Sequence, residues 1–209
     1  FSIDIQPRQI IGLIGPNGAG KTTIFNLITG VYKPTQGHIT FEDKEITGLL
    51  PYKITHQGIV RTFQNIRLFS NMTVLENIMV ARHYRMKSGI FTSVLRLPAF
   101  IKEEKEVEEK AAEYAKIFGL TDSLNAPAGS LPYGRQRRVE IVRALVTEPK
   151  LLLLDEPAAG MNSKEALQLL DLIKQIAEDF KLTILLIEHQ MPVVMGVAER
   201  IHVLDFGRT

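Results

Sequence analysis

The sequence predicts an α/β protein in which a largely parallel sheet carries an inserted helical segment. Residues 10–14, 151–154 and 183–187 are apolar runs without polar alternation, typical of parallel strands covered on both faces. Strands alternate with helix-period segments towards both ends of the chain, whereas no strand is convincing from residue 65 to about 129. This order favours one α/β core interrupted by a helical insertion.

An antiparallel edge is expected beside the parallel strands. Residues 1–5 alternate apolar and polar side chains, as a half-buried strand does. Residues 38–41 predict another short strand, which turns back towards Ile46. The other elements expected before the insertion are a helix at 22–29, a helix at 51–57 and a strand at 58–63 that ends at Gln64.

The helical insertion is assigned to residues 65–139, within a core formed by residues 1–64 and 140–209. Thr73 and Glu76 have the spacing of a capping box at a helix start. Residues 82–100 look irregular and basic. An amphipathic helix follows at residues 102–118, with an inward face of Val107, Ala111, Tyr114, Ala115 and Phe118.

The elements after the insertion complete one domain over residues 1–209. Asn162 with Glu165 is expected to cap the helix at 163–180, whose inward face includes Phe180. The other expected elements are helices at 136–146 and 191–198 and a last strand at 200–205. Both ends of the chain are expected to be truncated, because it begins inside a strand pattern and stops directly after another.

The strand at 10–14 leads into a glycine-rich stretch that fits the pattern Gly, four residues, Gly, Lys, then Ser or Thr. Successive backbone N–H groups and the start of the following helix suit the phosphates of a nucleotide. Lys21 is expected to bridge the terminal phosphates, and the Thr22 hydroxyl to ligate Mg²⁺. The nucleotide-binding residues predicted from this stretch are Gly15, Pro16, Asn17, Gly18, Ala19, Gly20, Lys21, Thr22 and Thr23.

Polar side chains stand at the carboxyl ends of three other predicted strands, where open α/β sheets bind ligands. Asp155 is predicted to hold Mg²⁺, and its neighbour Glu156 to polarise the water that attacks the γ-phosphate. His189 is predicted to orient that phosphate and the water. Gln64 is a further candidate for the metal or the water, although a lone glutamine is weak evidence.

The composition limits the other classes of function. A formal net charge of +2 is close to neutral and does not indicate a general nucleic-acid binder. The absence of cysteine excludes disulfides and thiolate metal sites. No apolar run approaches the roughly 20 residues that cross a bilayer, so a membrane role requires a partner protein.

Taken in order, these motifs resemble the nucleotide-binding subunits of ATP-binding cassette (ABC) transporters over essentially the whole chain. Gly15–Thr22 matches the Walker A loop, residues 151–156 match Walker B, and His189 matches the switch histidine. The resemblance implies a P-loop NTPase (RecA-like) core with an antiparallel β edge and an inserted helical subdomain. It also implies a D-loop at Asn162 and a signature motif, in the place of Leu-Ser-Gly-Gly-Gln, at Leu131, Pro132, Tyr133, Gly134, Arg135 and Gln136.

Two departures in the signature motif bear on function: Pro132 stands in place of its serine, and Tyr133 stands in place of its second glycine while Gly134 remains. Pro132 replaces the signature serine and so lacks its hydroxyl, which predicts slower hydrolysis at the site that the motif completes. Arg135 is a candidate for an added positive charge there. Asn162 stands where the family usually has Asp, and the aromatic residue that stacks on adenine normally precedes Phe1.

The resemblance implies an ATPase that uses ATP and Mg²⁺ and pairs with a second ABC ATPase subunit, identical or different. Transmembrane permease subunits and an external solute-binding protein are the other implied partners, and the cytoplasmic face of the inner or plasma membrane is the implied location. Residues 71–77, 137–140 and 187–189 resemble the ATPases of branched-chain amino-acid importers. The alternatives are a urea or amide importer, the lipopolysaccharide exporter, a soluble non-transport ABC ATPase and a non-hydrolysing regulatory cassette.

Overall fold

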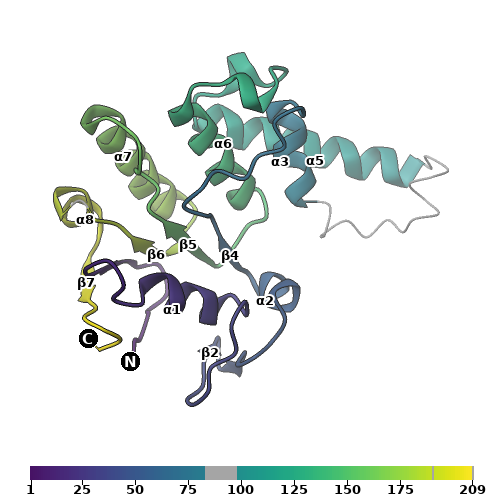
Figure 1. Ribbon diagram of the computed structural model, residues 1–209. Helices are drawn as coiled ribbons and strands as arrows, with labels where there is room; N and C mark the ends of the chain where they lie inside the picture. The colour runs from purple at the N-terminus through teal and green to yellow at the C-terminus, as the bar shows by residue number, and fades with distance from the viewer. Residues whose placement is uncertain (83–97, 190, 209) are drawn as a thin grey trace. The chain divides into compact units, whose positions relative to one another are not determined.

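The computed structural model describes residues 1–82, 98–189 and 191–208, and they form two compact units (Figure 1). The first unit combines Phe1–Gln64 with Pro149–Thr209, and the second is Asn65–Glu148. The division expected from the sequence, after residue 139, was wrong by nine residues. Helix α6 (Tyr133–Leu145) runs unbroken through that point, so the second unit ends only after the helix does.

The first unit is built on a five-stranded parallel sheet in the order β4-β5-β6-β1-β7. The strands predicted for this sheet are confirmed, although β4 and β7 are shorter than expected. Every residue of β5 is buried, as expected for a strand with both faces covered. The strands are β1 (Ile10–Ile14), β4 (Ile59–Arg61), β5 (Leu151–Asp155), β6 (Thr183–Ile187) and β7 (Arg200–Val203).

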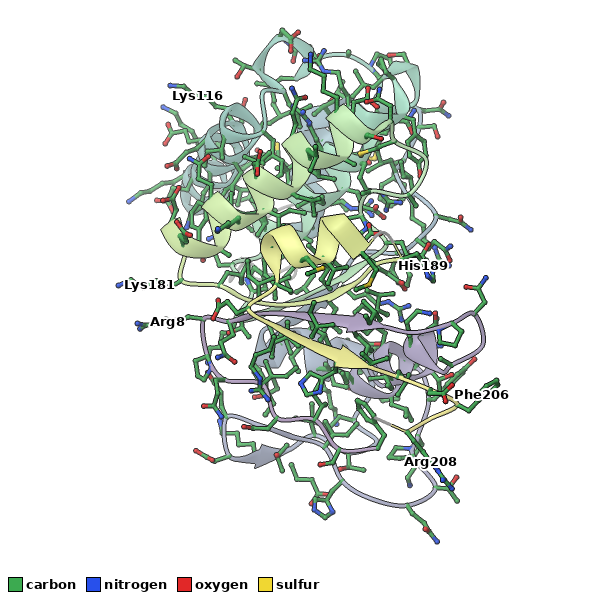
Figure 2. All side chains as sticks on the ribbon, turned by 90° about the vertical axis from the view of Figure 1, so that its left-hand side faces the viewer. Arg8, Lys116, Lys181, His189, Phe206 and Arg208 are labelled. Atoms are coloured by element: carbon green, nitrogen blue, oxygen red, sulfur yellow. The ribbon has the colours of Figure 1, made fainter. Side chains whose placement is uncertain are left out.

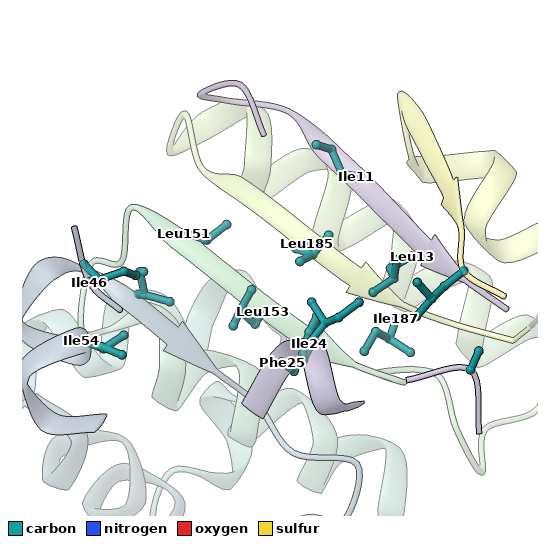
Figure 3. Close-up of a cluster of buried hydrophobic side chains, with 13 residues drawn as sticks. Ile11, Leu13, Ile24, Phe25, Ile46, Ile54, Leu151, Leu153, Leu185 and Ile187 are labelled. Carbon is teal, nitrogen blue, oxygen red and sulfur yellow. The ribbon is translucent and has the colours of Figure 1, made fainter. Parts of the chain in front are cut away.

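Helices cover both faces of this sheet (Figure 1). On one face, Ile24 and Phe25 of α1 (Lys21–Ile28) pack into a cluster with side chains of β1, β5 and β6 (Figure 3). On the other face lie α7 (Ser163–Asp179) and α8 (Met191–Val197). Side chains that alternate along each strand therefore enter two separate apolar layers.

The end of α7 differs from the sequence-based expectation. The predicted capping box is confirmed, because the Asn162 side chain accepts the Glu165 N–H and the Glu165 carboxylate accepts the Asn162 N–H. Phe180 was expected on the buried face but is 42% exposed. The helix ends at Asp179, and Phe180 is its C-cap, with its N–H bonded to the Ile176 carbonyl at 3.0 Å.

The antiparallel part of the first unit is smaller than expected. It consists of β2 (Thr40–Phe41) and β3 (Lys44–Glu45), and α2 (Pro51–Gln57) follows. The strand predicted at residues 1–5 is absent from the described structure. Ile3 and Ile5 are half-buried against the core cluster, as their alternation suggested, but the segment has no neighbouring strand to pair with.

The second unit is helical, as predicted. It contains α3 (Val74–Arg82), α5 (Pro98–Ile117) and α6, with short 3₁₀ turns at Thr121–Ser123 and Ala128–Ser130. All five residues predicted for the inward face of α5 are buried. The irregular segment predicted at 82–100 lies mostly outside the described residues. Among the described helices, none is long and apolar enough to span a bilayer.

Hydrogen bonds of polar side chains fix the start of α3. Glu76 accepts the backbone N–H of Thr73 at 2.8 Å, and the Thr73 hydroxyl accepts the Glu76 N–H, which confirms the capping box. The Asn77 side chain is fully buried and donates to the backbone carbonyls of Phe69, Met72 and Thr73. The chain that leads into α3 is thereby held by polar bonds as well as by packing.

Candidate active site

The glycine-rich loop lies between β1 and α1, at the carboxyl edge of the parallel sheet. Gly15 passes so close to the chain after β7 that a Cβ would lie 2.1 Å from the Leu204 carbonyl oxygen. Gly20 is the N-cap of α1 in the left-handed conformation, with φ of 103°. The loop therefore delivers the chain directly into the first turn of α1, whose N–H groups lack partners within the helix.

The Lys21 side chain folds back over this loop. Its Nζ donates to the carbonyl oxygens of Gly15 at 2.8 Å and Pro16 at 3.0 Å, and the residue is only 7% exposed. A positive charge is thus held at the helix N-terminus, where the helix dipole already favours anions. Thr22 and Thr23, which follow on the same helix, are exposed.

Glu156 lies between two of the other predicted site residues. Its Oε2 accepts a hydrogen bond from Gln64 Nε2 at 2.9 Å, and its Oε1 lies 2.5 Å from His189 Nε2. An ionised carboxylate only accepts hydrogen bonds, so His189 Nε2 is the donor in that state. Figure 2 labels His189 just after the end of β6. The structure therefore brings together the three side chains predicted to act on water and the γ-phosphate.

The backbone of Glu156 is held in an uncommon conformation. Its φ is +48°, in the left-handed region that side chains other than glycine rarely adopt. Its N–H bonds to the Ile187 carbonyl at 2.9 Å, and its own carbonyl accepts the Ala159 N–H at 3.1 Å. These bonds turn the chain sharply after β5 and direct the Glu156 carboxylate towards His189. Such conformations concentrate at functional sites.

Asp155 is buried and paired with Arg61, a residue that the sequence analysis did not select. Arg61 Nη2 donates to Asp155 Oδ2 at 2.6 Å, and the two side chains are 7% and 4% exposed. Arg61 Nη1 donates to Asn26 Oδ1 at 2.6 Å, and the guanidinium lies 5.2 Å from the ring centres of Phe25 and Phe63. One arginine thus links α1, β5 and the chain that leads to Gln64.

In the second unit, the predicted signature residues Leu131–Gln136 form the entrance to α6. Pro132 is the N-cap, and the Gln136 side chain closes the turn by donating to the Leu131 carbonyl at 2.8 Å. Arg135, expected to offer its charge to a phosphate, instead bonds to Asp122, Ser123 and Gly119. Its hydrogen bond lowers the pKa of Asp122 below the ordinary value. The guanidinium of Arg135 is therefore engaged within the second unit.

Behind the exposed Tyr133, α6 carries a buried ion pair. Arg137 is fully buried and donates to Glu140 Oε2 at 2.6 Å, and it contacts the Tyr133 hydroxyl at 3.3 Å. Burial raises the pKa of Glu140, against the opposing effect of Arg137. These contacts fix the position of Tyr133, which stands in place of a signature glycine.

Comparisons with known proteins agree with this geometry. The family model described as "ABC transporter" matches residues 1–159. The chain belongs to the ABC transporter family.

Its relatives within that family are similar over nearly its whole length. The chain is 48% identical to the high-affinity branched-chain amino acid transport ATP-binding protein LivG of Salmonella typhimurium, over 99% of this chain and 81% of LivG. It is 45% identical to BraF of Pseudomonas aeruginosa, a protein of the same description, over the same shares of the two chains. Among solved structures, the ADP conformation of the ATP-binding cassette MJ1267 matches with a TM-score of 0.84 and 34% identity, over 99% of this chain and 80% of that one.

Membership of the ABC family accounts for the order of the motifs. The chain is therefore an ATP-binding, ATP-hydrolysing transporter subunit, as predicted. A further solved relative, MJ0796, has a TM-score of 0.81 and 27% identity over 98% of this chain and 84% of that one, and is a dimer in a post-hydrolysis state bound to ADP and phosphate.

Sequence reasoning missed two charged residues of this ABC site. Arg61 is buried. The only sign of this in the sequence was that a charged residue stands within the mostly apolar strand predicted at residues 58–63. Glu188 precedes the predicted histidine and is only 2% exposed. Arg61 matches no motif, and Glu188 lies in the matched residues 187–189 but was not selected as a site residue, so the roles of both were recognised only from their contacts in the structure.

Proposed function

We propose that this chain hydrolyses ATP at the carboxyl edge of its parallel sheet to power an importer of branched-chain amino acids. The observation that carries the hydrolytic part is the position of Glu156 between Gln64 and His189. β1 and β5 both neighbour β6 in parallel, so the glycine-rich loop and Glu156 leave the sheet at the same edge. The likeness to LivG and BraF supports the amino-acid substrate.

Residues Gly15–Thr23 bind the nucleotide phosphates in this proposal. The narrow loop at Gly15 and the first turn of α1 offer backbone N–H donors, and Lys21 adds a charge-assisted donor. Lys21 exchanges its bonds to the Gly15 and Pro16 carbonyls for bonds to the terminal phosphates. The exchange is favourable because the Lys21 ammonium group already lies at the loop and its present acceptors are neutral carbonyls, whereas phosphate oxygens are charged.

Thr22, Gln64 and Asp155 are the residues that would hold Mg²⁺. The described residues contain no group of three or more His, Cys, Asp or Glu side chains arranged for a metal. This fits Mg²⁺, which is usually held by one or two carboxylates together with substrate phosphates and water. When bound, the ion neutralises charge on the phosphates. The Arg61 pair keeps one oxygen of Asp155 fixed and so sets the direction of the other.

Glu156 acts as the general base and His189 as the orienting residue. The carboxylate accepts the proton of the attacking water, and the hydrogen bond from Gln64 fixes the position of the accepting group. His189 Nε2, bonded to the same carboxylate, carries a donor that reaches the γ-phosphate when it turns from Glu156. The contact with His189 and the turn at Glu156 argue against a non-hydrolysing regulatory cassette, which Pro132 had suggested.

Two ATPase subunits, identical or different, complete each other's sites. Leu131–Gln136 of one subunit, at the N-terminus of α6, meets the phosphates bound by the other, and Asn162 lies in the D-loop of this interface. Pro132 supplies no hydroxyl, but the first turn of α6 retains its N–H groups and the positive end of its dipole. We expect hydrolysis with Pro132 to be slower than with serine, not absent.

Transmembrane permease subunits and an external solute-binding protein are the proposed partners, and the subunit is peripheral at the cytoplasmic face of the membrane. The test is uptake of labelled leucine into cells that lack their own branched-chain importer but express this chain with its permease subunits. We expect ATP-dependent uptake that Lys21→Met abolishes. Purification of the chain without any permease, with ATPase activity independent of membrane proteins, would favour a soluble ABC ATPase instead. Uptake of urea or an amide in place of leucine would reassign the substrate.

A further inference from the structure

Glu188 is a buried carboxylate directly beneath the predicted catalytic pair. It is 2% exposed and follows β6, in the position before His189. Ile187, its neighbour in the chain, belongs to the apolar cluster on the α1 face of the sheet. Because side chains alternate along a strand, Glu188 points to the opposite face.

Both carboxylate oxygens of Glu188 accept backbone hydrogen bonds. Oε1 accepts the N–H of Ala158 at 2.9 Å, and Oε2 accepts the N–H of His189 at 3.1 Å. Ala158 lies two residues after Glu156, in the loop that leads to Asn162. The side chain therefore joins the loop that carries the general base to the loop that carries the histidine.

The bonds of Glu188 complete a set of ties around Glu156. The Glu156 N–H already bonds to the Ile187 carbonyl, and the Glu156 side chain contacts His189. The Ala158 bond adds a third tie after the turn, where the chain leaves β5 with a positive φ at Glu156. A single-residue turn in this conformation persists only when its surroundings hold it, and Glu188 adds a second contact on its carboxyl side to the bond between the Glu156 carbonyl and the Ala159 N–H.

We propose that Glu188 is a positioning residue for ATP hydrolysis, which fixes the mutual geometry of Glu156 and His189 through their loops. This inference rests on the proposed function of those two residues. Hydrogen bonds to an ionised acceptor are stronger than neutral ones, and burial excludes water as a substitute acceptor. The carboxylate bonds both to Ala158, in the loop after β5, and to His189, in the loop after β6. A displacement of one of these loops is therefore passed to the other.

Two substitutions separate the positioning role from simple packing. Glu188→Gln keeps the shape and one acceptor oxygen, so it retains one of the two backbone bonds. Glu188→Ala loses both. Small displacements of catalytic groups cost up to about 100-fold in rate, so we expect kcat to fall about tenfold in Glu188→Gln and about 100-fold in Glu188→Ala. The KM for ATP should stay within about twofold of wild type in both, because the backbone N–H groups that Glu188 accepts belong to Ala158 and His189 and not to the glycine-rich loop.

The control is Glu199→Gln, at an exposed carboxylate. Glu199 is also a carboxylate of the first unit that accepts a backbone N–H, that of Ile10, but it stands at the amino edge of the sheet. We expect Glu199→Gln to leave both kcat and KM unchanged. The steady-state ATPase assay uses the chain purified together with its partner subunits, with Glu156→Gln as the blank.

Amide hydrogen exchange supplies a readout that does not depend on turnover. In Glu188→Ala the amides of Ala158 and His189 should exchange faster, while those of α1 should be unchanged. Unchanged kcat in a folded Glu188→Ala, or a rise in KM with kcat retained, would overturn the proposal, as would unchanged exchange at both amides. If Glu188→Ala does not fold, the kcat of Glu188→Gln decides the question in the same way. Absence of turnover in the wild-type assembly would instead contradict the proposed function of Glu156.

Discussion

The buried ion pair between Arg61 and Asp155 provides a quantitative test of how this site is built. We expect Arg61→Met to destabilise the first unit strongly, because it leaves the Asp155 carboxylate buried without its partner. The two side chains are 7% and 4% exposed and their atoms are 2.6 Å apart. Removing one member of such a pair costs about 3–5 kcal/mol of unfolding free energy. Methionine preserves the length and much of the volume of the side chain, so the effect reports the loss of the charge together with its hydrogen bonds to Asp155 and Asn26.

The expected shift is large enough to measure easily. For a chain of this size, about 4 kcal/mol corresponds to a fall in melting temperature of roughly 8–16 °C. Urea unfolding followed by circular dichroism gives the midpoint, and the comparison is made where the slope is unchanged. Adding Asp155→Leu should recover part of the loss, because the double variant no longer buries an unpaired charge.

The control for Arg61→Met is Lys150→Met. The Lys150–Glu42 pair has the same distance of 2.6 Å, but its side chains are 57% and 49% exposed. Exposed pairs contribute about 0–1 kcal/mol, so Lys150→Met should hardly change the midpoint. If Arg61→Met were no more destabilising than Lys150→Met, the argument from burial would be refuted.

Three further predictions concern the nucleotide loop and the two capping boxes. Lys21→Met should weaken ATP binding by about 10–100-fold, from the loss of charge-assisted hydrogen bonds, with a fluorescent ATP analogue as the probe; unchanged affinity would remove Lys21 from the site. Asn162→Ala should lower the free energy of unfolding, measured in urea, by about 1 kcal/mol. Asn162→Asp, which introduces the usual family residue, should be neutral or stabilising at the start of α7. Equal losses of unfolding free energy in the two variants would contradict the capping role. The backbone and hydroxyl bonds from Thr73 hold the pKa of Glu76 below its ordinary value of 4.5, so their stabilising effect is present above that pH and is lost as the pH falls through the lower folded value. Unfolding measured from pH 6 downwards should therefore show a smaller acid-induced loss in Glu76→Gln than in wild type, and parallel curves would exclude this source of pH dependence.

The elements predicted correctly are those with strong local signals. The apolar runs of β1, β5 and β6 have no polar alternation, and only a sheet covered on both faces buries them. Capping boxes also depend on residues three positions apart, so Thr73 with Glu76 and Asn162 with Glu165 were readable from the sequence.

The mistaken elements depend on contacts that local patterns do not encode. Residues 1–5 alternate like a strand, but a strand needs a neighbour, and the described sheets provide none for them. Phe180, the C-cap of α7, is exposed although helical spacing placed it on the buried face. α6 begins at Tyr133, three residues before the predicted start, because Pro132 acts as its N-cap.

The residues of the candidate site also fall into those that the sequence identified and those that only the structure identified. Its glycines, Lys21 and the acidic residues after β5 follow motifs, and chain topology brings them to one edge of the sheet. The partners that orient these residues were not identified as site residues from any motif. Arg61 is recognised from its contacts with Asp155 and Asn26, and Glu188 from its backbone bonds. Such residues are specified by the folded chain as a whole, so sequence spacing did not identify them.

The central claim is that Glu156, held by Gln64 and His189, is the base for ATP hydrolysis. The most direct measurement is single-turnover cleavage of Mg-ATP by the chain with its partner ATPase subunit, comparing wild type with Glu156→Gln at increasing protein concentration. We expect Glu156→Gln to bind ATP and hold the two subunits together, while its cleavage rate falls by at least about 100-fold. A Glu156→Gln variant that cleaves ATP at the wild-type rate would contradict the account.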